Sequence, residues 1–227
     1  MRKIQRLAAV GAAAALSVVL GACSGSGTST TATAPSSAPA AAPTSAAAAA
    51  ASDGVTTNAD VFGPACSQLP QGDMPGSLNN MGPQPVASAA STNPLLSTLV
   101  TAVGQVPGLA DTLNQQEAIT VYAPFNGAFD AVKTAVGDQA FTALLNNPTQ
   151  LGALLSYHVV PKRYDAAGLV AAGTTTQLAG GEVTVGGSAT APTLTSGDGT
   201  TASVLCGNIP TSNATVFVID KVLMPKS

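Results

Sequence analysis

The feature that most constrains the fold is a long segment near the amino terminus that contains no residue able to build a hydrophobic core. Residues 24–52 read SGSGTSTTATAPSSAPAAAPTSAAAAAAS and consist only of Ala, Ser, Thr, Pro and Gly. Such a segment cannot bury enough apolar surface to offset the conformational entropy lost on folding. We therefore expect it to be a disordered stalk, and any globular domain to lie in the residues that follow it.

The residues before the stalk have the layout of a secretory signal. Three basic residues at positions 2, 3 and 6 precede an uncharged apolar run, residues 7–20, which is shorter than the roughly 20 residues that cross a bilayer as a helix. The run ends in LGAC, residues 20–23, and this resembles the bacterial lipobox, in which the cysteine thiol is diacylated and the peptide is cut before it. The resemblance implies a lipoprotein signal peptide over residues 1–22, a lipidated stalk over residues 23–52 and a membrane anchor at Cys23. The alternative is a soluble secreted protein.

The charge of the chain excludes one class of partner. Removal of the signal leaves a net charge of about −6, and charged residues are only 8% of the chain. Binding to nucleic acid requires a basic surface. The charge therefore predicts that the protein does not bind nucleic acid. Together with the signal, the sequence predicts an exported cell-surface protein.

Two cysteines remain after Cys23. Cys66 and Cys206 form an even pair in a chain that is predicted to be exported, which favours a disulfide. Two buried free thiols and a redox pair are the alternatives. A disulfide would fasten the segment after the stalk, residues 53–83, to the far end of the fold.

The first half of the remaining chain has helical patterns. Asn93, Asn126, Asp138 and Asn147 each precede an apolar periodic segment and are candidate N-caps. Between the early helices and the later ones, the β-branched and aromatic run at residues 119–122 predicts a strand.

The second half changes to short β-rich runs separated by Gly, Pro, Asn and Asp. The runs are TTTQL, GEVTVG, PTLT, ASVLC and ATVFVIDKVLMP, all after residue 173. This is the pattern of antiparallel strands joined by turns. The fold class predicted is α+β, with helices early and a β-sheet or sandwich late.

Three segments in this order resemble conserved blocks of the fasciclin-like domain family. They are TVYAPFNGAF at 120–129, LLSYHVVP at 154–161 and NATVFVIDKVLMP at 213–225. Together with the lipobox and stalk they resemble actinobacterial surface fasciclin lipoproteins. The resemblance implies a fasciclin-like domain over residues 84–226, a β-sandwich or wedge with N-terminal helices packed on it. Phe125 departs from the pattern, since the family usually has Thr or Ser there.

The resemblance also implies a function in adhesion or protein binding, with no enzymatic activity and no cofactor. The partners it implies are host or matrix surface proteins, including integrin-like receptors, or neighbouring cells, although the chain has no Arg-Gly-Asp tripeptide. A module that binds an apolar small molecule or an envelope lipid is the alternative function, and a passive envelope component is a third.

His158 is the only histidine in the chain, and its sequence context favours a packed residue over a reactive one. Leu151, Leu154, Leu155 and His158 stand at helical spacing on one apolar stripe. No nucleophile motif accompanies the histidine, and a zinc site needs several ligands, of which one histidine supplies only one. The family resemblance supplies the other interpretation, in which Tyr157 and His158 support adhesion. We expect any such effect of His158 to act through the integrity of the fold.

Overall fold

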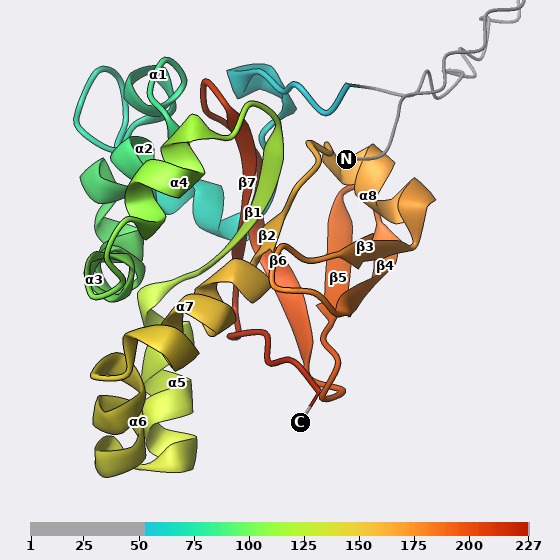
Figure 1. Cartoon of the computed structure of the whole chain (residues 1–227). Coiled ribbons are helices and arrows are strands. Elements are labelled where there is room, and N and C mark those ends of the chain that lie inside the picture. Colours follow the sequence, from blue (N-terminus) through green and yellow to red (C-terminus); the bar gives the residue numbers. More distant parts are fainter. Residues whose placement is uncertain (1–52, 227) are drawn as a thin grey trace, which may run out of the picture. The chain divides into compact units, whose positions relative to one another are not determined.

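A computed structural model describes residues 53–226 of the chain. The predicted signal peptide, the predicted lipidation site Cys23 and the predicted stalk lie outside these residues. The described residues have the α+β class predicted from the sequence, with helices and strands in one continuous body (Figure 1).

Eight α-helices and three short 3-10 helices occur in residues 53–226. The α-helices are α1 Leu78–Met81, α2 Val86–Thr92, α3 Ser97–Gly104, α4 Leu109–Gln115, α5 Asn126–Val136, α6 Asp138–Leu145, α7 Pro148–Tyr157 and α8 Ala166–Ala172. The 3-10 helices are η1 Asn58–Asp60, η2 Pro64–Gln68 and η3 Pro94–Leu96.

The strands form one bent seven-stranded sheet in the order β2-β1-β7-β6-β5-β4-β3. Their bounds are β1 Ile119–Pro124, β2 Val159–Val160, β3 Thr174–Thr176, β4 Glu182–Ser188, β5 Ala191–Thr195, β6 Thr201–Pro210 and β7 Ala214–Ile219. The pair of β1 and β7 is parallel, and every other pair of neighbouring strands in the sheet is antiparallel.

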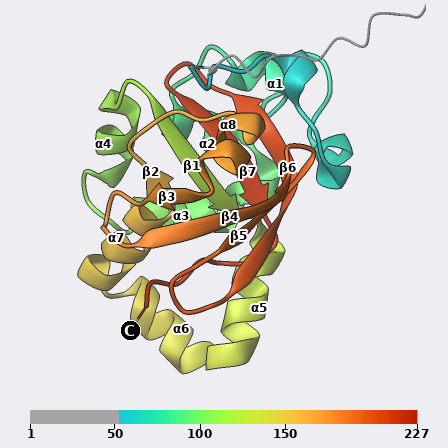
Figure 2. The same ribbon diagram turned by 90° about the vertical axis from the view of Figure 1, so that its right-hand side faces the viewer.

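Strand β6 divides the sheet into two halves because it pairs with different neighbours along its length. Residues 201–203 pair with β5, and residues 204–210 pair with β7 with two shifts of register. At the second shift Asn208 has a φ of 58°, a left-handed conformation that Asn tolerates better than most residues and that is typical of a β-bulge. The bend turns the β3–β5 half over the β1–β7 half, as Figure 2 shows. The sheet halves therefore enclose a core in the manner expected of a sandwich or wedge.

Strands β1 and β7 are buried along their whole length because both of their faces are covered. On one face Tyr122, Phe217 and Ile219 pack into a core shared with β3–β6, which we call the strand core. On the other face Val121 and Val216 pack into a second core with the helices, which we call the helical core. In Figure 1, α1–α4 lie on one side of β1 and β7, and β3–β5 lie on the other.

Two of the four predicted N-caps are confirmed, and two are wrong. Asn93 and Asn147 each accept a bond from a backbone N–H at the start of their helices. Asn126 is instead the first residue of α5, and its side chain caps a different helix, since its Oδ1 accepts from the Thr98 N–H of α3 at 3.0 Å. Asp138 is the first residue of α6 and pairs with Lys133 at 3.4 Å.

Residues 53–226 contain no single helix that is long and apolar enough to cross a membrane. The segments Val86–Thr92 and Pro94–Gly104 reach the required length and hydropathy only when they are counted together, across a bend of 102°. In the fold these segments are α2, η3 and α3, whose apolar residues pack into the helical core.

Candidate functional site

The Tyr157–His158 pair lies at the carboxyl end of α7, where the helical core and the strand core meet. Tyr157 is the last residue of α7, and His158 is its C-cap. Leu151 and Leu155 of the predicted apolar stripe are buried, and Leu154 packs against the helical core. The predicted position of His158 at the end of this stripe is therefore what the structure shows.

Both ring nitrogens of His158 are bonded to the backbone. Nε2 accepts from the Leu223 N–H at 2.9 Å, which requires the proton of the neutral ring to be on Nδ1, and Nδ1 donates to the Leu154 carbonyl at 2.8 Å. Burial lowers the pKa of His158 to about 4, and the bond to Leu154 offsets only part of this effect. A neutral imidazole with no unbonded nitrogen holds the C-terminal segment against α7 and has no nitrogen available to take a proton from a substrate.

Tyr157 makes the corresponding connection to the strand half. Its hydroxyl donates to the Glu182 carbonyl of β4 at 2.9 Å and accepts from the Gly197 N–H in the β5–β6 turn at 3.0 Å. The ring is 1% exposed. Tyr157 and His158 therefore join α7 to three separate parts of the chain, and this geometry supports a structural role for the pair.

Two carboxylates, Asp165 and Glu182, lie in the segments that follow α7. Asp165 caps α8 by accepting from the Gly168 N–H at 2.7 Å, and Glu182 is exposed at the start of β4. Within residues 53–226 no group of three or more His, Cys, Asp or Glu side chains is placed to hold a metal ion.

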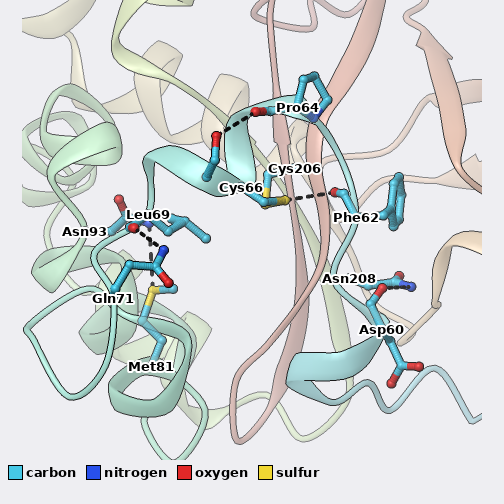
Figure 3. The surroundings of a disulfide bond; sticks show 11 residues. Asp60, Phe62, Pro64, Cys66, Leu69, Gln71, Met81, Asn93, Cys206 and Asn208 are labelled. Atoms are coloured by element: carbon cyan, nitrogen blue, oxygen red, sulfur yellow. Dashed lines mark hydrogen bonds between the residues drawn. A yellow bond between two sulfur atoms is a disulfide. The ribbon is translucent and has the colours of Figure 1, made fainter.

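The structure contains the disulfide between Cys66 and Cys206, which are separated by 140 residues in sequence. Cys66 lies in η2 and Cys206 in β6, as Figure 3 shows. Beside the disulfide, Phe62 and Gly207 exchange two backbone hydrogen bonds, of 2.8 and 3.3 Å. The Phe62 ring occupies the space of a side chain at Gly207, because a Cβ there would lie 2.4 Å from the ring. The segment that follows the stalk is thus attached at the bend of β6.

A cavity of about 310 Å³ lies within the helical layer. Helices α2, α3 and α4 form its walls, and residues of β1, β2 and the end of α7 line the remaining side, with His158 among them. Its lining contains no Lys, Arg, Asp or Glu. Sequence patterns alone gave no indication of this cavity.

Asn213 fixes two of the helices that surround the cavity. Its Oδ1 accepts from the Val86 N–H at the start of α2, at 2.9 Å. Its Nδ2 donates to the carbonyls of Leu113 and Gln116 at the end of α4, both at 2.8 Å. The residue is 8% exposed, so its side chain is a buried clamp between α2, α4 and the start of β7.

The outer face of the β3–β6 half carries a row of threonines. Thr174, Thr184, Thr195 and Thr201 are direct neighbours across the four strands. Thr195 and Thr201 are joined by a hydroxyl hydrogen bond of 3.0 Å. Alternate residues of the same strands, such as Val183 and Leu194, point into the strand core. We call these four residues the threonine row; they make this face a regular surface of hydroxyl and methyl groups.

Comparison with known proteins gives one family. The Fasciclin domain model matches residues 94–225. The chain is 40% identical over 174 residues to the immunogenic protein MPB70 of Mycobacterium bovis, covering 73% of this chain and 83% of that protein. It is also 40% identical over 180 residues to the cell surface glycolipoprotein MPB83 of Mycobacterium bovis, covering 74% and 73%.

A more distant relative and a solved structure agree with this result. Protein sll1483 of Synechocystis is 33% identical over 144 residues, covering 62% of this chain and 73% of that protein. The structure of a FAS1 domain pair from the insect cell adhesion molecule fasciclin I matches with a TM-score of 0.54 at 15% identity, covering 62% of this chain. This chain spans 51% of that domain pair, and the likeness concerns the fold alone. The chain belongs to the fasciclin domain family.

Proposed function

We propose that this protein is a lipid-anchored adhesion protein, in which a fasciclin domain is displayed on the cell surface and binds proteins of host cells, matrix or neighbouring cells. Family membership and the surface and immunogenic relatives support an exported protein with an adhesion-type role. The observation that carries the finer proposal is the order of parts, in which a lipobox ending at Cys23 and a stalk over residues 23–52 precede the domain. That order suits presentation of the domain away from a membrane.

The geometry of the Tyr157–His158 pair bears on where a partner would bind. Both side chains are buried, at 1% and 3% exposure, so neither offers a surface to a macromolecule. Their contribution to adhesion is the positioning of α7, the β5–β6 turn and the C-terminal segment. A partner must instead contact an exposed face.

We assign the adhesive surface to the threonine row. Interface centres are depleted of charge, and the four residues of the row are uncharged. The neighbouring strand β3 is an edge strand with a partner strand on one side only, and edge strands are common places for a peptide strand to bind. A surface of hydroxyl and methyl groups beside an edge strand can bind a protein through both side-chain and backbone hydrogen bonds.

The anchor is tested by Cys23→Ala. The variant should move from the membrane fraction into the culture medium, because the thiol that carries the acyl chains is gone. Immunoblots of the two fractions measure this. A variant that stays in the membrane fraction would refute lipidation as the anchor.

The adhesive surface is tested with the released protein. Saturable binding to host cells or matrix proteins is expected, and the double variant Thr184→Lys, Thr195→Lys should abolish most of it by placing two charges in the row. Thr142→Lys on the exposed face of α6 is the matched control and should bind like the parent. Equal loss in both variants, or no saturable binding by the parent, would count against the proposal.

A further inference from the structure

The cavity of the helical layer has the properties of a small-molecule site. Its volume of about 310 Å³ lies at the lower end of the range for such sites, about 300–1,000 Å³. It is about twice the size of an apolar cavity that takes up benzene. Aliphatic side chains form most of its lining, including Leu99, Val103, Leu113, Val121 and Leu155.

The space exists because small residues stand at the helix positions that face it. Ala87 and Ala90 of α2, Gly104 at the end of α3 and Ala110 of α4 all line the cavity. A Cβ built on Gly104 would meet no atom within 4 Å. The Asn213 clamp bonds to the start of α2 and the end of α4, and so fixes two of these three helices relative to β7.

The buried polar side chains of the lining have no free hydrogen-bonding group for a ligand. The ring nitrogens of His158 are both bonded to the backbone, and the Tyr122 hydroxyl is bonded to Thr175 in the strand core, at 3.1 Å. This part of the cavity is therefore apolar in effect.

The other polar residues of the lining lie where the cavity meets solvent. Ser91 is exposed, and Ser88 and Asn114 are half-buried. The Ser91 hydroxyl donates to the Ser88 carbonyl, and the Asn114 Oδ1 accepts from the Ala87 N–H. Within residues 53–226 the Ser88 hydroxyl and the Asn114 amide NH₂ have no hydrogen-bond partner. They can bond to a neutral oxygen group at the rim.

We propose that this cavity binds a single alkyl chain that ends in an uncharged oxygen head group, as in a monoacylglycerol or a fatty alcohol. The alkyl chain packs against the aliphatic side chains inside the cavity, and the Ser88 hydroxyl and the Asn114 amide bond to the head group at the rim. No lining residue is Lys, Arg, Asp or Glu, so a carboxylate or ammonium head would gain no counter-charge at the rim. A methylene group needs roughly the volume of a water molecule in the liquid, about 30 Å³, so the cavity holds a chain of about ten carbons.

The test is calorimetric titration of the full chain carrying Cys23→Ala, so that no acyl chain of its own competes. Monoacylglycerols with six to fourteen carbons in the chain are used below their micellar concentrations. Affinity should rise about fourfold for each added methylene up to about ten carbons and then level off. Sodium decanoate and decyltrimethylammonium, matched in length to glycerol monodecanoate, should bind at least tenfold more weakly.

Two matched substitutions separate the cavity from the rest of the surface. Ala110→Leu fills the cavity and should abolish binding while keeping or raising the thermal midpoint, whereas Ala131→Leu on the exposed face of α5 should leave binding unchanged. Gly104→Leu serves as a second filling variant. Ser88→Ala should weaken binding about fivefold through the loss of one hydrogen bond. No saturable binding, equal affinity for the charged lipids, or full binding by both filling variants would overturn the proposal.

Discussion

The helical core and the strand core lie on opposite faces of the same two strands, yet they are packed differently. The strand core is closed, because the bent sheet encloses large side chains such as Tyr122, Tyr157 and Phe217, each at most 1% exposed. The helical core contains a cavity of about 310 Å³ between short helices. In this domain the closed face fixes the shape of the sheet, and the open face has room for a ligand.

Besides apolar packing, specific links connect segments that are far apart in the chain. Three such links are the Cys66–Cys206 disulfide, the His158 bonds and the Asn213 clamp. Each joins a different set of segments. Substitutions in these three links and in the two cores should therefore change the stability of the domain in ways that can be measured separately.

The largest effect is expected from removal of the disulfide. The loop that it closes spans 140 residues, and the chain-entropy treatment gives up to about 5 kcal/mol for a loop of that size. The double variant Cys66→Ala, Cys206→Ala should lose most of that free energy of unfolding in urea titrations. Reduced wild-type protein is the control and should match the double variant. A loss below about 1 kcal/mol would show that the bend of β6 does not depend on the disulfide.

The next largest effect is expected from a Leu→Ala substitution, whose cost in free energy of unfolding should differ between the two cores. Leu194 is fully buried in the strand core, and Leu113 lines the cavity of the helical core. Leu194→Ala should cost about 4 kcal/mol because the closed core cannot collapse around the hole, and Leu113→Ala about 2 kcal/mol because one side of the residue already faces open space. Urea unfolding of both variants measures the difference. Equal costs, or the reverse order, would mean that the two cores are packed alike.

The third effect is a pH dependence that arises mainly from His158. Its pKa is about 4 in the folded protein and about 6.5 when exposed, so between these values the unfolded chain binds more protons than the folded one. Stability should therefore be full above pH 6.5 and fall by about 3 kcal/mol as the pH is lowered to 4. Because the chain has one histidine, His158→Gln should remove this slope. A slope that persists in the variant would contradict the assignment.

The smallest effect is expected at the Asn213 clamp. Asn213→Ala leaves the Val86 N–H and two α4 carbonyls without their partner and should cost about 2 kcal/mol. Thermal unfolding of the variant and of Asn146→Ala, an exposed matched control, measures it. The variant should also bind glycerol monodecanoate more weakly, since the clamp holds two walls of the cavity. Unchanged stability would show that the helices are held by packing alone.

The elements with strong patterns were predictable from sequence. The strand at residues 119–122, the five later strands, the apolar stripe that ends at His158 and the Asn93 and Asn147 caps all depend on neighbours in sequence, and the structure confirms them. Strand β7 ends at Ile219, short of the predicted run to Pro225. The short helices α1, α2 and α8 were not predicted, since each is too short to show a clear apolar period.

Features that depend on tertiary contacts could not be predicted. The parallel pairing of β1 with β7, the Asn126 cap on α3 and the Asn213 clamp each join residues far apart in the chain. The cavity depends on where Ala90, Gly104 and Ala110 fall in space. An alanine in a helix has the same local signature whether it faces a ligand, a neighbouring helix or solvent.

The most direct test of the difference between the two faces is amide hydrogen exchange of the protein with and without glycerol monodecanoate. Without lipid, amides of α2, α3 and α4 should exchange through openings of lower free energy than amides of β1, β6 and β7. With lipid, protection should rise in these three helices and stay unchanged in β3–β5. A rise spread evenly over the domain, or one confined to β3–β5, would contradict the account.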